Sequence, residues 1–368
     1  MTVSDVEHIM EEWAPLWTAL DRDNVGLQFG RRNRRVSRIM IALEITGMVV
    51  QEAAQKRIDL IVTHHPPLFH PLSSLTDTDQ IGRNILALVE KNVAVYSAHT
   101  NLDFTRDGVS FTLAKILGLQ DIRFLSPLDG TLSKIVVFVP PTHVEKTAKV
   151  MSECGAGVIG EYEDCSFRVE GTGTFKGSRA SQPYLGNRQS FEHVNETRLE
   201  MVAPTSYVPR IVQAIKRVHP YEEVAYDVYP LNSPNVNYGM GAFGKLDHEV
   251  TLQTFLQRCK RRLSARSIRF TGNKHGTIKT VAVCGGSGSD LLEKAVQAKA
   301  DAFVTADVRY HTFHAAHERI ALIDAGHWET EHCILEPVRT RLTEATRRLG
   351  QRVSIMVAQT STNPVKSI

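Results

Sequence analysis

Short runs of apolar residues alternate with amphipathic stretches near both ends of the chain. In the first half, apolar runs at 38–44 and 57–65 flank a helical stretch. In the second half, runs at 280–286 and 300–307 flank a helical stretch at 290–299. Uninterrupted apolar runs separated by helices are typical of parallel strands that are buried on both faces of a sheet.

Each of these segments continues through another helical stretch into a further apolar strand, at 93–99 in the first half and at 320–325 in the second. A pattern that recurs along the chain indicates a repeated structural unit. We therefore predict an α/β fold in which a duplicated α/β unit forms one discontinuous domain. Residues 1–127 would be the first half of this domain and residues 241–368 the second half.

The region between the two halves has a different order of elements. Its pattern predicts strand, helix, two strands, helix and strand over residues 131–230, which is the βαββαβ order of the ferredoxin-like motif. We therefore predict an inserted α+β domain at 128–240 with turn-rich edges. The polar stretch 171–195 is longer than a routine connection, and we expect a loop there, either a variable surface loop or a mobile or functional one.

The composition is that of a globular protein, with 42% hydrophobic and 23% charged residues. Lys and Arg number 43 and Asp and Glu 40, and the net charge of +3 indicates neither a nucleic-acid nor a membrane partner. No apolar stretch approaches the ~20 residues that cross a bilayer, and Asp5 and Glu7 stand where a leader would be apolar. The five cysteines are scattered and indicate no disulfide framework. We expect a cytoplasmic protein.

Histidines are concentrated in two places. Nine of the 15 histidines lie in the windows 64–99 and 311–332. Both windows contain the segments that follow the predicted strands, and ligands of open α/β sheets bind beyond the carboxyl ends of the strands. The clustering therefore places candidate chemistry at the strand ends of both halves.

Three short motifs in these windows combine imidazoles with carboxylates. His64 and His65 follow a buried strand, Asp103 follows the next one, and His327 and Glu331 follow the corresponding strand of the second half. Each motif alone is also typical of a strand-end turn, a helix cap or a solvated surface pair. Together they predict a dinuclear metal site in which one carboxylate bridges. The mixed ligands suit two divalent ions of Zn, Fe, Mn or Ni, which the sequence does not distinguish.

Other residues of these regions are candidates for supporting roles. His99 and His311 are candidate catalytic residues that would move protons beside the metal ions without binding them. The glycine-rich segment Cys284–Asp290 predicts a strand-to-helix turn. Its backbone could bind an anion, or it could be a tight turn capped by Ser289.

Five ordered motifs resemble one known family. They are Asp23-Asn-Val-Gly-Leu27, Thr63-His-His-Pro66, His99-Thr-Asn-Leu-Asp103, Gly285-Gly-Ser-Gly288, and Asp324-Ala-Gly-His327 with Glu331. Together they resemble the dinuclear-metal-centre, NIF-three-like proteins, which are also labelled GTP cyclohydrolase 1 type 2 homologues. The insert, with His219-Pro-Tyr-Glu-Glu223, looks like the PII-like domain of longer members. Trp328 departs from the pattern, since a Tyr is commoner there, and this leaves the substrate open.

The resemblance carries expectations about the metal ligands and the assembly. It implies that His65 and Asp103 bind one metal ion, that His64 and His327 bind the other, and that Glu331 bridges them. It also implies a homo-oligomer, a hexameric toroid with the metal sites facing its cavity.

Two functions follow from this reading. Paired metal ions lower the pKa of a bound water and polarise a substrate oxygen, which is the arrangement for hydrolysis. The leading hypothesis is a metal-dependent hydrolase, and the family label suggests GTP or a related purine nucleotide, attacked at the imidazole-ring carbon of the base. The alternative is a non-enzymatic metal-binding oligomer for storage, sensing or regulatory assembly. The sequence has no evident guanine or triphosphate recognition motif, so both hypotheses stay open.

Overall fold

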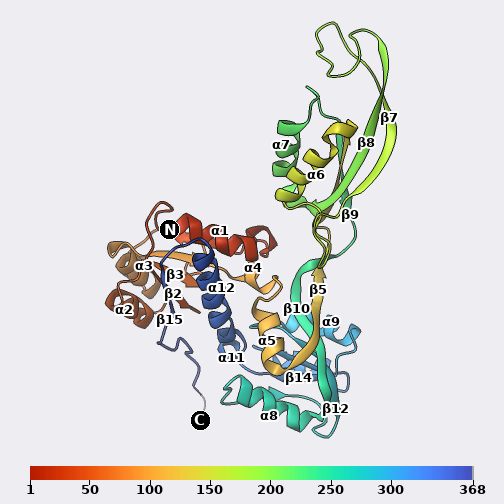
Figure 1. Cartoon of the computed structure of the whole chain (residues 1–368). Coiled ribbons are helices and arrows are strands. Elements are labelled where there is room, and N and C mark those ends of the chain that lie inside the picture. The colour runs from red at the N-terminus through yellow and green to blue at the C-terminus, as the bar shows by residue number, and fades with distance from the viewer. Residues whose placement is uncertain (367–368) are drawn as a thin grey trace. The chain divides into compact units, whose positions relative to one another are not determined.

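The structure is a computed structural model that describes residues 1–366. By its internal contacts the chain divides into two compact units. The larger unit comprises Met1–Ser126 and Tyr238–Ile368, and the smaller unit is Pro127–Asn237. Figure 1 shows the helices and strands of both units, which are described separately below.

The larger unit contains a five-stranded sheet. Its strands lie in the order β1 (Gly26–Phe29), β4 (Ala94–Ser97), β3 (Leu60–Thr63), β2 (Arg38–Ala42) and β15 (Ser354–Val357). Strands β15, β2, β3 and β4 are parallel, and β1 is antiparallel to β4. Every residue of β3 and β4 is buried, as their uninterrupted apolar runs predict.

A second sheet of the same unit has six strands. Their order is β11 (Arg269–Phe270), β14 (Ala321–Asp324), β13 (Ala302–Thr305), β12 (Thr277–Val283), β10 (Asn235–Thr251) and β5 (Leu119–Leu128). Strands β12, β13 and β14 are parallel, and the short β11 is antiparallel to β14. Strands β2, β3 and β4 of the first sheet, with the antiparallel β1, have the same arrangement. The two sheets differ at β10, which is antiparallel to β12, whereas β15 is parallel to β2.

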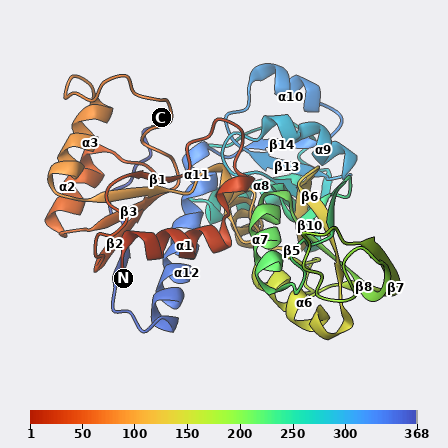
Figure 2. The same ribbon diagram turned by 90° about the horizontal axis from the view of Figure 1, so that it is seen from above.

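Helices cover both faces of the first sheet. Helices α2 (Gly47–Gln55) and α3 (Gln80–Glu90) lie on one face, and α1 (Val3–Trp13) and α12 (Leu335–Arg348) lie on the other, as Figure 2 shows. Neighbouring residues of β2 explain the two cores: Ile39 packs toward α1 and α12, and Met40 packs toward α2 and α3. Helix α1 begins with a capping box between Thr2 and Asp5.

The second sheet is covered in the same way. Helices α5 (Val109–Leu117) and α8 (Leu252–Arg262) contribute to the core on one face, and α9 (Leu292–Gln297) and α10 (Tyr310–Ala316) to the core on the other. Two further short helices, α4 (Thr100–Asp103) and α11 (His327–Glu331), closely follow β4 and β14. Their side chains therefore lie near the carboxyl ends of parallel strands.

The smaller unit contains one antiparallel sheet and two helices. Its elements are β6 (Leu132–Val139), α6 (Val144–Glu153), β7 (Phe167–Lys176), β8 (Phe191–Pro204), α7 (Val208–Val218) and β9 (Tyr226–Leu231), and the strand order is β7-β8-β6-β9. Alternate residues of β6, such as Ile135 and Val137, pack with Ile211 and Ile215 of α7 in its core.

The expected loop over 171–195 is shorter in the structure, because both ends of that segment belong to strands. Strand β7 continues to Lys176 and β8 begins at Phe191, and these two residues pair in register. The connection is therefore confined to 177–190. Most residues at this end of the hairpin are exposed, so the sequence there has no alternation of apolar and polar positions to indicate a strand.

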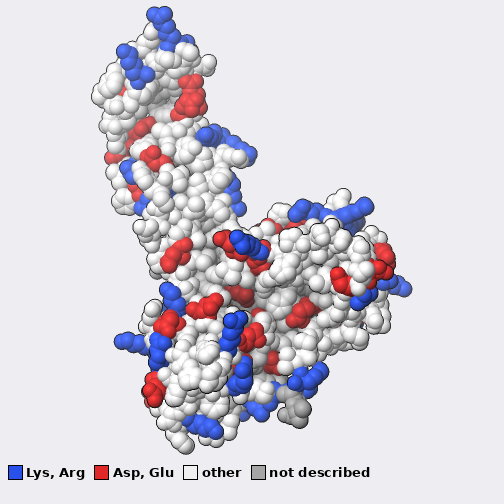
Figure 3. Space-filling model, turned by 180° about the vertical axis from the view of Figure 1, so that it is seen from behind, with Lys and Arg blue, Asp and Glu red and all other residues white. Residues whose placement is uncertain are grey.

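The surface carries both signs of charge. On the face shown in Figure 3, Lys and Arg side chains are interspersed with Asp and Glu, as the near balance of these residues predicts. Within residues 1–366, every helix is too short or too polar to span a bilayer.

Candidate metal centre

Two histidines directly follow the carboxyl end of strand β3. The His64 N–H donates to the Ala42 carbonyl at 3.3 Å and the His65 N–H to the Leu43 carbonyl at 2.9 Å, which ties both residues to the end of β2. Their ring centroids are 4.9 Å apart. His64 Nδ1 lies 2.8 Å from the Ala98 carbonyl oxygen, which can only accept. Nδ1 therefore carries the proton, and Nε2 presents a lone pair.

Helix α11 brings an imidazole and a carboxylate to the same place. His327 and Glu331 are one helical turn apart, and His327 Nε2 lies 3.1 Å from Glu331 Oε2. The same oxygen lies 3.0 Å from His65 Nε2. The other ring nitrogen of each histidine contacts a second carboxylate. His327 Nδ1 lies 2.6 Å from an oxygen of Asp307, and His65 Nδ1 lies 3.1 Å from an oxygen of Glu44. Carboxylates in this position fix the orientation of metal-binding histidines.

Asp103, the last residue of α4, approaches the other histidine. Its Oδ1 lies 3.7 Å from His64 Nε2, which in turn lies 3.8 Å from Glu331 Oε1. Glu331 therefore presents one oxygen to His64 and the other to His65 and His327. Two atoms that bind one ion at about 2.1 Å are about 3–3.5 Å apart, so both groups are near the spacing that a shared ion needs.

Three atoms of this cluster are buried without a hydrogen-bond partner among the described residues. They are His64 Nε2, Asp103 Oδ1 and Glu331 Oε2. The contacts given above are within ion-pair range, but they do not satisfy these atoms with hydrogen-bond geometry. Buried polar atoms are nearly always satisfied, and a cation is one of the few partners that accounts for such a group. The residues therefore fit a metal ion.

The charges of the cluster lead to the same conclusion. Burial opposes ionisation of Glu331, but the imidazoles of His327, His64 and His65 hold its pKa well below the usual range. Burial also opposes protonation of His65, yet Glu331 and Glu44 raise its pKa to about 10. Contact with Glu331 raises the pKa of His327 to about 9.

The buried carboxylate thus takes up positive charge as protons on His65 and His327. A divalent ion can replace these protons, because metal binding to histidine releases them. Asp103 fits the same account, since burial raises its pKa to about 7 and a cation beside it would restore the ionised form.

The distances pair the five residues differently from the expectation that the resemblance carried. His65 lies with His327 against one oxygen of Glu331, and His64 lies with Asp103 near the other. The described residues contain two groups that could hold a metal ion, His65 with His327 and Glu331, and His64 with His65 and His99.

His99 lies beside both strand-end histidines. Its ring centroid is 5.3 Å from those of His64 and His65. Its Nδ1 is 2.8 Å from Asp23 Oδ1, and Thr100 also donates to Asp23. Burial opposes ionisation of Asp23, but these contacts prevail and lower its pKa to about 2. The Asp23 carboxylate accepts from the N–H at His99 Nδ1, so Nε2 is the ring nitrogen that faces away from Asp23.

His311 occupies a different environment. It is an exposed residue near the start of α10, and its ring packs against Tyr310 with centroids 5.5 Å apart. Among the described residues it belongs to neither group of candidate metal ligands. The structure therefore brings six of the seven candidate residues together and leaves His311 apart.

The glycine-rich turn after β12 packs against Glu331. A Cβ at Gly286 would overlap Glu331 Oε1, and the backbone φ there is +60°. The Gly286 N–H donates to Thr330 at 3.0 Å and the Gly288 N–H to Thr305 at 2.9 Å. The expected cap by Ser289 is wrong, because the turn uses these hydroxyls and Ser289 Oγ has no partner within residues 1–366. The turn lets backbone approach the carboxylate closely.

Sequence reasoning missed two supporting carboxylates. Glu44 lies just beyond the end of β2 and Asp23 just before β1. Each contacts the Nδ1 atom of a histidine. Glu44 belongs to the apolar run 38–44, so its position at the end of a predicted parallel strand could have identified it. Asp23 precedes its strand, and only the first resembling motif pointed to it.

A cavity of about 380 Å³ opens beside this cluster. Its lining consists of Glu44, His65, Ser267, Arg269, Asp307, Asp324, Gly326, His327, Trp328, Glu329, Asn363, Pro364 and Val365. The volume is in the range of small-molecule sites. The Arg269 guanidinium pairs with Asp324 and retains much exposed surface, so it could also contact an anionic group in the cavity.

Fold and cluster together define a class: an α/β protein that gathers imidazoles and carboxylates at its strand ends and could bind metal there. The family model described as Duf34/NIF3 (NGG1p interacting factor 3) matches residues 1–364, and the chain belongs to this family. A relative from Bacillus subtilis (strain 168), named GTP cyclohydrolase 1 type 2 homolog, is 37% identical over 361 residues, covering 97% of this chain and 96% of the relative. The resemblance stated from the sequence is confirmed.

Solved structures agree with this assignment. A Bacillus cereus protein related to NIF3 matches with a TM-score of 0.88 and 35% identity, covering 100% of this chain and 99% of that one. A Staphylococcus aureus protein matches with a TM-score of 0.80 and 29% identity, again over 100% of this chain and 99% of the other. The fold of the whole chain is therefore shared with these proteins.

Proposed function

We propose that His64, His65, Asp103, His327 and Glu331 bind two divalent metal ions. The observation that carries this proposal is the group of buried, unsatisfied atoms described above. The distances support one ion between His65 and His327 and a second between His64 and Asp103, with one oxygen of Glu331 for each. Both nitrogen and oxygen ligands are present, which suits Zn, Fe, Mn or Ni.

We further propose that the chain is a metal-dependent hydrolase. When bound, the ions would polarise a substrate oxygen and lower the pKa of a water molecule. The name of the curated relatives makes GTP and related purine nucleotides the first substrates to test. The cavity of about 380 Å³ beside the cluster supports a substrate of this general size, and Arg269 in its lining would attract an anionic group.

Other residues of the chain would orient the metal ligands and transfer protons. Glu44 and Asp307 orient His65 and His327 through their Nδ1 atoms. His99 would hold or transfer a proton at Nε2, since its hydrogen bond to the Asp23 carboxylate fixes the other nitrogen. The buried floor of the cluster excludes water from one side, which strengthens each electrostatic contact.

Metal analysis combined with nucleotide turnover tests the proposal. Purified full-length chain would be loaded with each candidate metal in turn and assayed with GTP, other nucleotides, phosphoesters and peptides. We expect turnover that disappears with a chelator, returns with added metal and falls sharply in His65→Ala. His314→Ala is the matched control, because His314 is an exposed histidine of α10 outside the cluster.

The same experiment separates the alternative function. A fully loaded chain that binds metal tightly and is inert toward all four substrate classes would favour storage, sensing or regulatory assembly. A chain that binds no metal would refute both functions.

We also propose that the larger unit is one discontinuous domain built from a duplicated α/β unit, and that the smaller unit is an inserted ferredoxin-like, PII-like domain. The shared strand arrangement of the two sheets supports the duplication, and the unit boundaries near 127 and 237 support the insertion. Excision of 130–236 should leave a soluble chain that still binds metal. Light scattering should give the mass of a hexamer for the intact chain, as the resemblance implies.

A further inference from the structure

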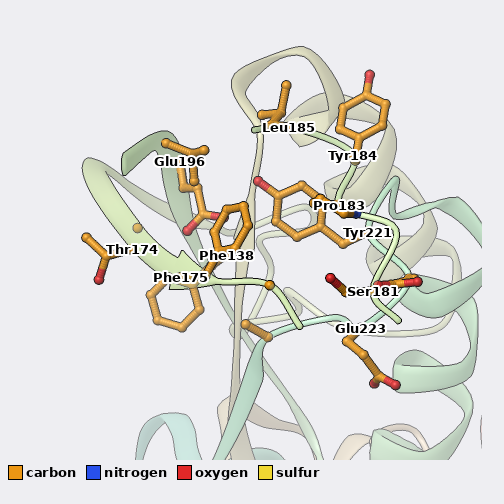
Figure 4. A pocket seen from close by; sticks show the side chains of 15 residues that line it. Phe138, Thr174, Phe175, Ser181, Pro183, Tyr184, Leu185, Glu196, Tyr221 and Glu223 are labelled. Carbon is orange, nitrogen blue, oxygen red and sulfur yellow. The ribbon is translucent and has the colours of Figure 1, made fainter. Parts of the chain in front are cut away.

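The smaller unit contains a cavity of its own, of about 420 Å³. Figure 4 shows that its walls come from β6, β7, β8, the 181–185 segment and the segment Tyr221–Glu223. Four aromatic rings line it, those of Phe138, Phe175, Tyr184 and Tyr221. The metal cluster does not use any of these residues, and the cavity belongs entirely to the smaller unit.

The aromatic wall is held in place by the His-Pro-Tyr-Glu-Glu motif. The Tyr221 N–H donates to His219 Nδ1 at 3.2 Å, so the proton of His219 is on Nε2, which donates to the Phe138 carbonyl at 3.0 Å. The rings of His219 and Tyr221 pack edge to face, with centroids 4.9 Å apart. These contacts fix Tyr221 beside the strand that carries Phe138, so this wall of the cavity is preformed.

The charged side chains that line the cavity are of one sign. Its lining includes Glu196, Glu222 and Glu223, and within residues 1–366 it contains no Lys or Arg. Glu222 is engaged, since it accepts a hydrogen bond from the Gln182 N–H at 2.6 Å. Glu196 lies over Gly173, where any Cβ would overlap its carboxylate. In Figure 4 the Glu196 carboxylate turns toward the Phe138 ring, whereas Glu223 extends outward.

A further polar atom in the cavity wall is buried. The Tyr221 hydroxyl oxygen interacts with the nearby Glu196 carboxylate but forms no hydrogen bond of normal geometry among the described residues. Burial and the nearby Glu196 raise the pKa of Tyr221 well above its usual range, so the phenol stays neutral and can donate or accept. The guanidinium of Arg198 lies 5.9 Å from the Phe138 ring centroid and is paired with Glu200 at 2.7 Å.

We propose that this cavity binds an organic cation with an apolar body, of the arylalkylammonium class. The aromatic rings offer negative faces to an ammonium group and apolar area to the rest of the ligand. The Glu196 carboxylate supplies the opposite charge, and the Tyr221 hydroxyl supplies a hydrogen-bond partner. The lining residues within the described chain include three glutamates and no Lys or Arg, which favours a cation over an anion in this cavity. The proposal is independent of the metal centre.

Isothermal titration of the full-length chain with phenethylammonium tests the proposal, with 2-phenylethanol as the neutral analogue and phenylacetate as the anionic one. We expect phenethylammonium to bind, 2-phenylethanol to bind at least about tenfold more weakly, and phenylacetate not to bind. Glu196→Gln should weaken phenethylammonium about tenfold. Tyr221→Leu should weaken both phenethylammonium and 2-phenylethanol, because it removes a ring.

Glu170→Gln is the matched control, since Glu170 is an exposed glutamate of β7 outside the cavity lining. It should leave the affinity unchanged, and thermal unfolding of each variant checks that the smaller unit still folds. The proposal is overturned if phenethylammonium does not bind, if the alcohol binds equally well, or if Glu170→Gln and Glu196→Gln weaken binding to the same extent.

Discussion

Gly286→Ala is the substitution that most sharply tests the link between the glycine-rich turn and the metal centre. The new Cβ would overlap Glu331 Oε1 and would lie 3.0 Å from Glu331 Cδ and 3.3 Å from His327 Nε2. The carboxylate must therefore move away from its present contacts. Because this carboxylate faces both halves of the cluster, its displacement should weaken the binding of both metal ions.

Two costs of this substitution can be separated. Gly286 has a φ of +60°, and alanine in that region costs about 1–2 kcal/mol of folding stability. Gly350 has a φ of +65° and no atom within 4 Å of a Cβ built there, so Gly350→Ala carries the backbone cost without the steric one. Both glycines belong to the larger unit. We therefore expect Gly286→Ala to lose at least as much stability as Gly350→Ala.

Metal affinity should distinguish them. Displacing a carboxylate that holds the site together should weaken metal binding about 10–100-fold, by analogy with the loss of groups that orient metal ligands. Urea unfolding of metal-free protein measures the first cost, and calorimetric titration with Zn²⁺ measures the second. If Gly286→Ala and Gly350→Ala bind Zn²⁺ equally well, the turn does not position Glu331 and the reasoning is refuted.

Three further predictions concern carboxylates. Glu331→Gln should lower the occupancy of both metal ions after dialysis, whereas Asp103→Asn should lower mainly one; metal analysis that finds two ions retained in the Glu331 variant contradicts the bridging role. Asp307→Asn should weaken metal binding about 10–100-fold by releasing His327, with the folding stability nearly unchanged, and an unchanged titration would contradict this. Glu52→Gln should lower the unfolding free energy by about 2 kcal/mol at pH 7. Burial opposes ionisation of Glu52, but its hydrogen bonds lower its folded pKa from 4.5 to about 2, so this stability is present above pH 4.5 and is lost as the pH falls toward 2. A gap between wild type and variant that does not narrow in urea titrations below pH 4.5 would contradict this assignment.

The buried parallel strands could be predicted because their physical signal is strong. Strands such as β3 and β4 are buried on both faces, so their apolar runs are uninterrupted and contrast with the helices between them. The same reasoning placed His64 and His65 at a strand end, since polar residues that end a buried run lie at the edge of the sheet. This part of the site follows from the topology of parallel strands alone.

Other features depend on packing between segments that are distant in sequence. The exposed end of the hairpin of β7 and β8 lacks a buried face, so its residues do not alternate and resemble a loop. The grouping of His64 with Asp103 and of His65 with His327 depends on side-chain direction at the ends of different strands. No spacing along the chain encodes such directions.

The carboxylates that contact the Nδ1 atoms of the histidines could not be predicted from the sequence either. Glu44 and Asp23 are separated from the histidines they hold by 21 and 76 residues. A single carboxylate at such a distance has no distinguishing pattern, because solvated surface carboxylates are common in every sequence. Only the position of Glu44 at the end of a predicted strand offered a clue.

Anomalous diffraction from crystals grown with Zn²⁺, measured on both sides of the zinc absorption edge, tests the central claim most directly. We expect two peaks per chain, one between His65, His327 and Glu331, and one between His64, Asp103 and Glu331. Peaks at other residues only, or no peak within the cluster in crystals that contain bound zinc, would contradict the assignment of these five side chains as a dinuclear metal centre.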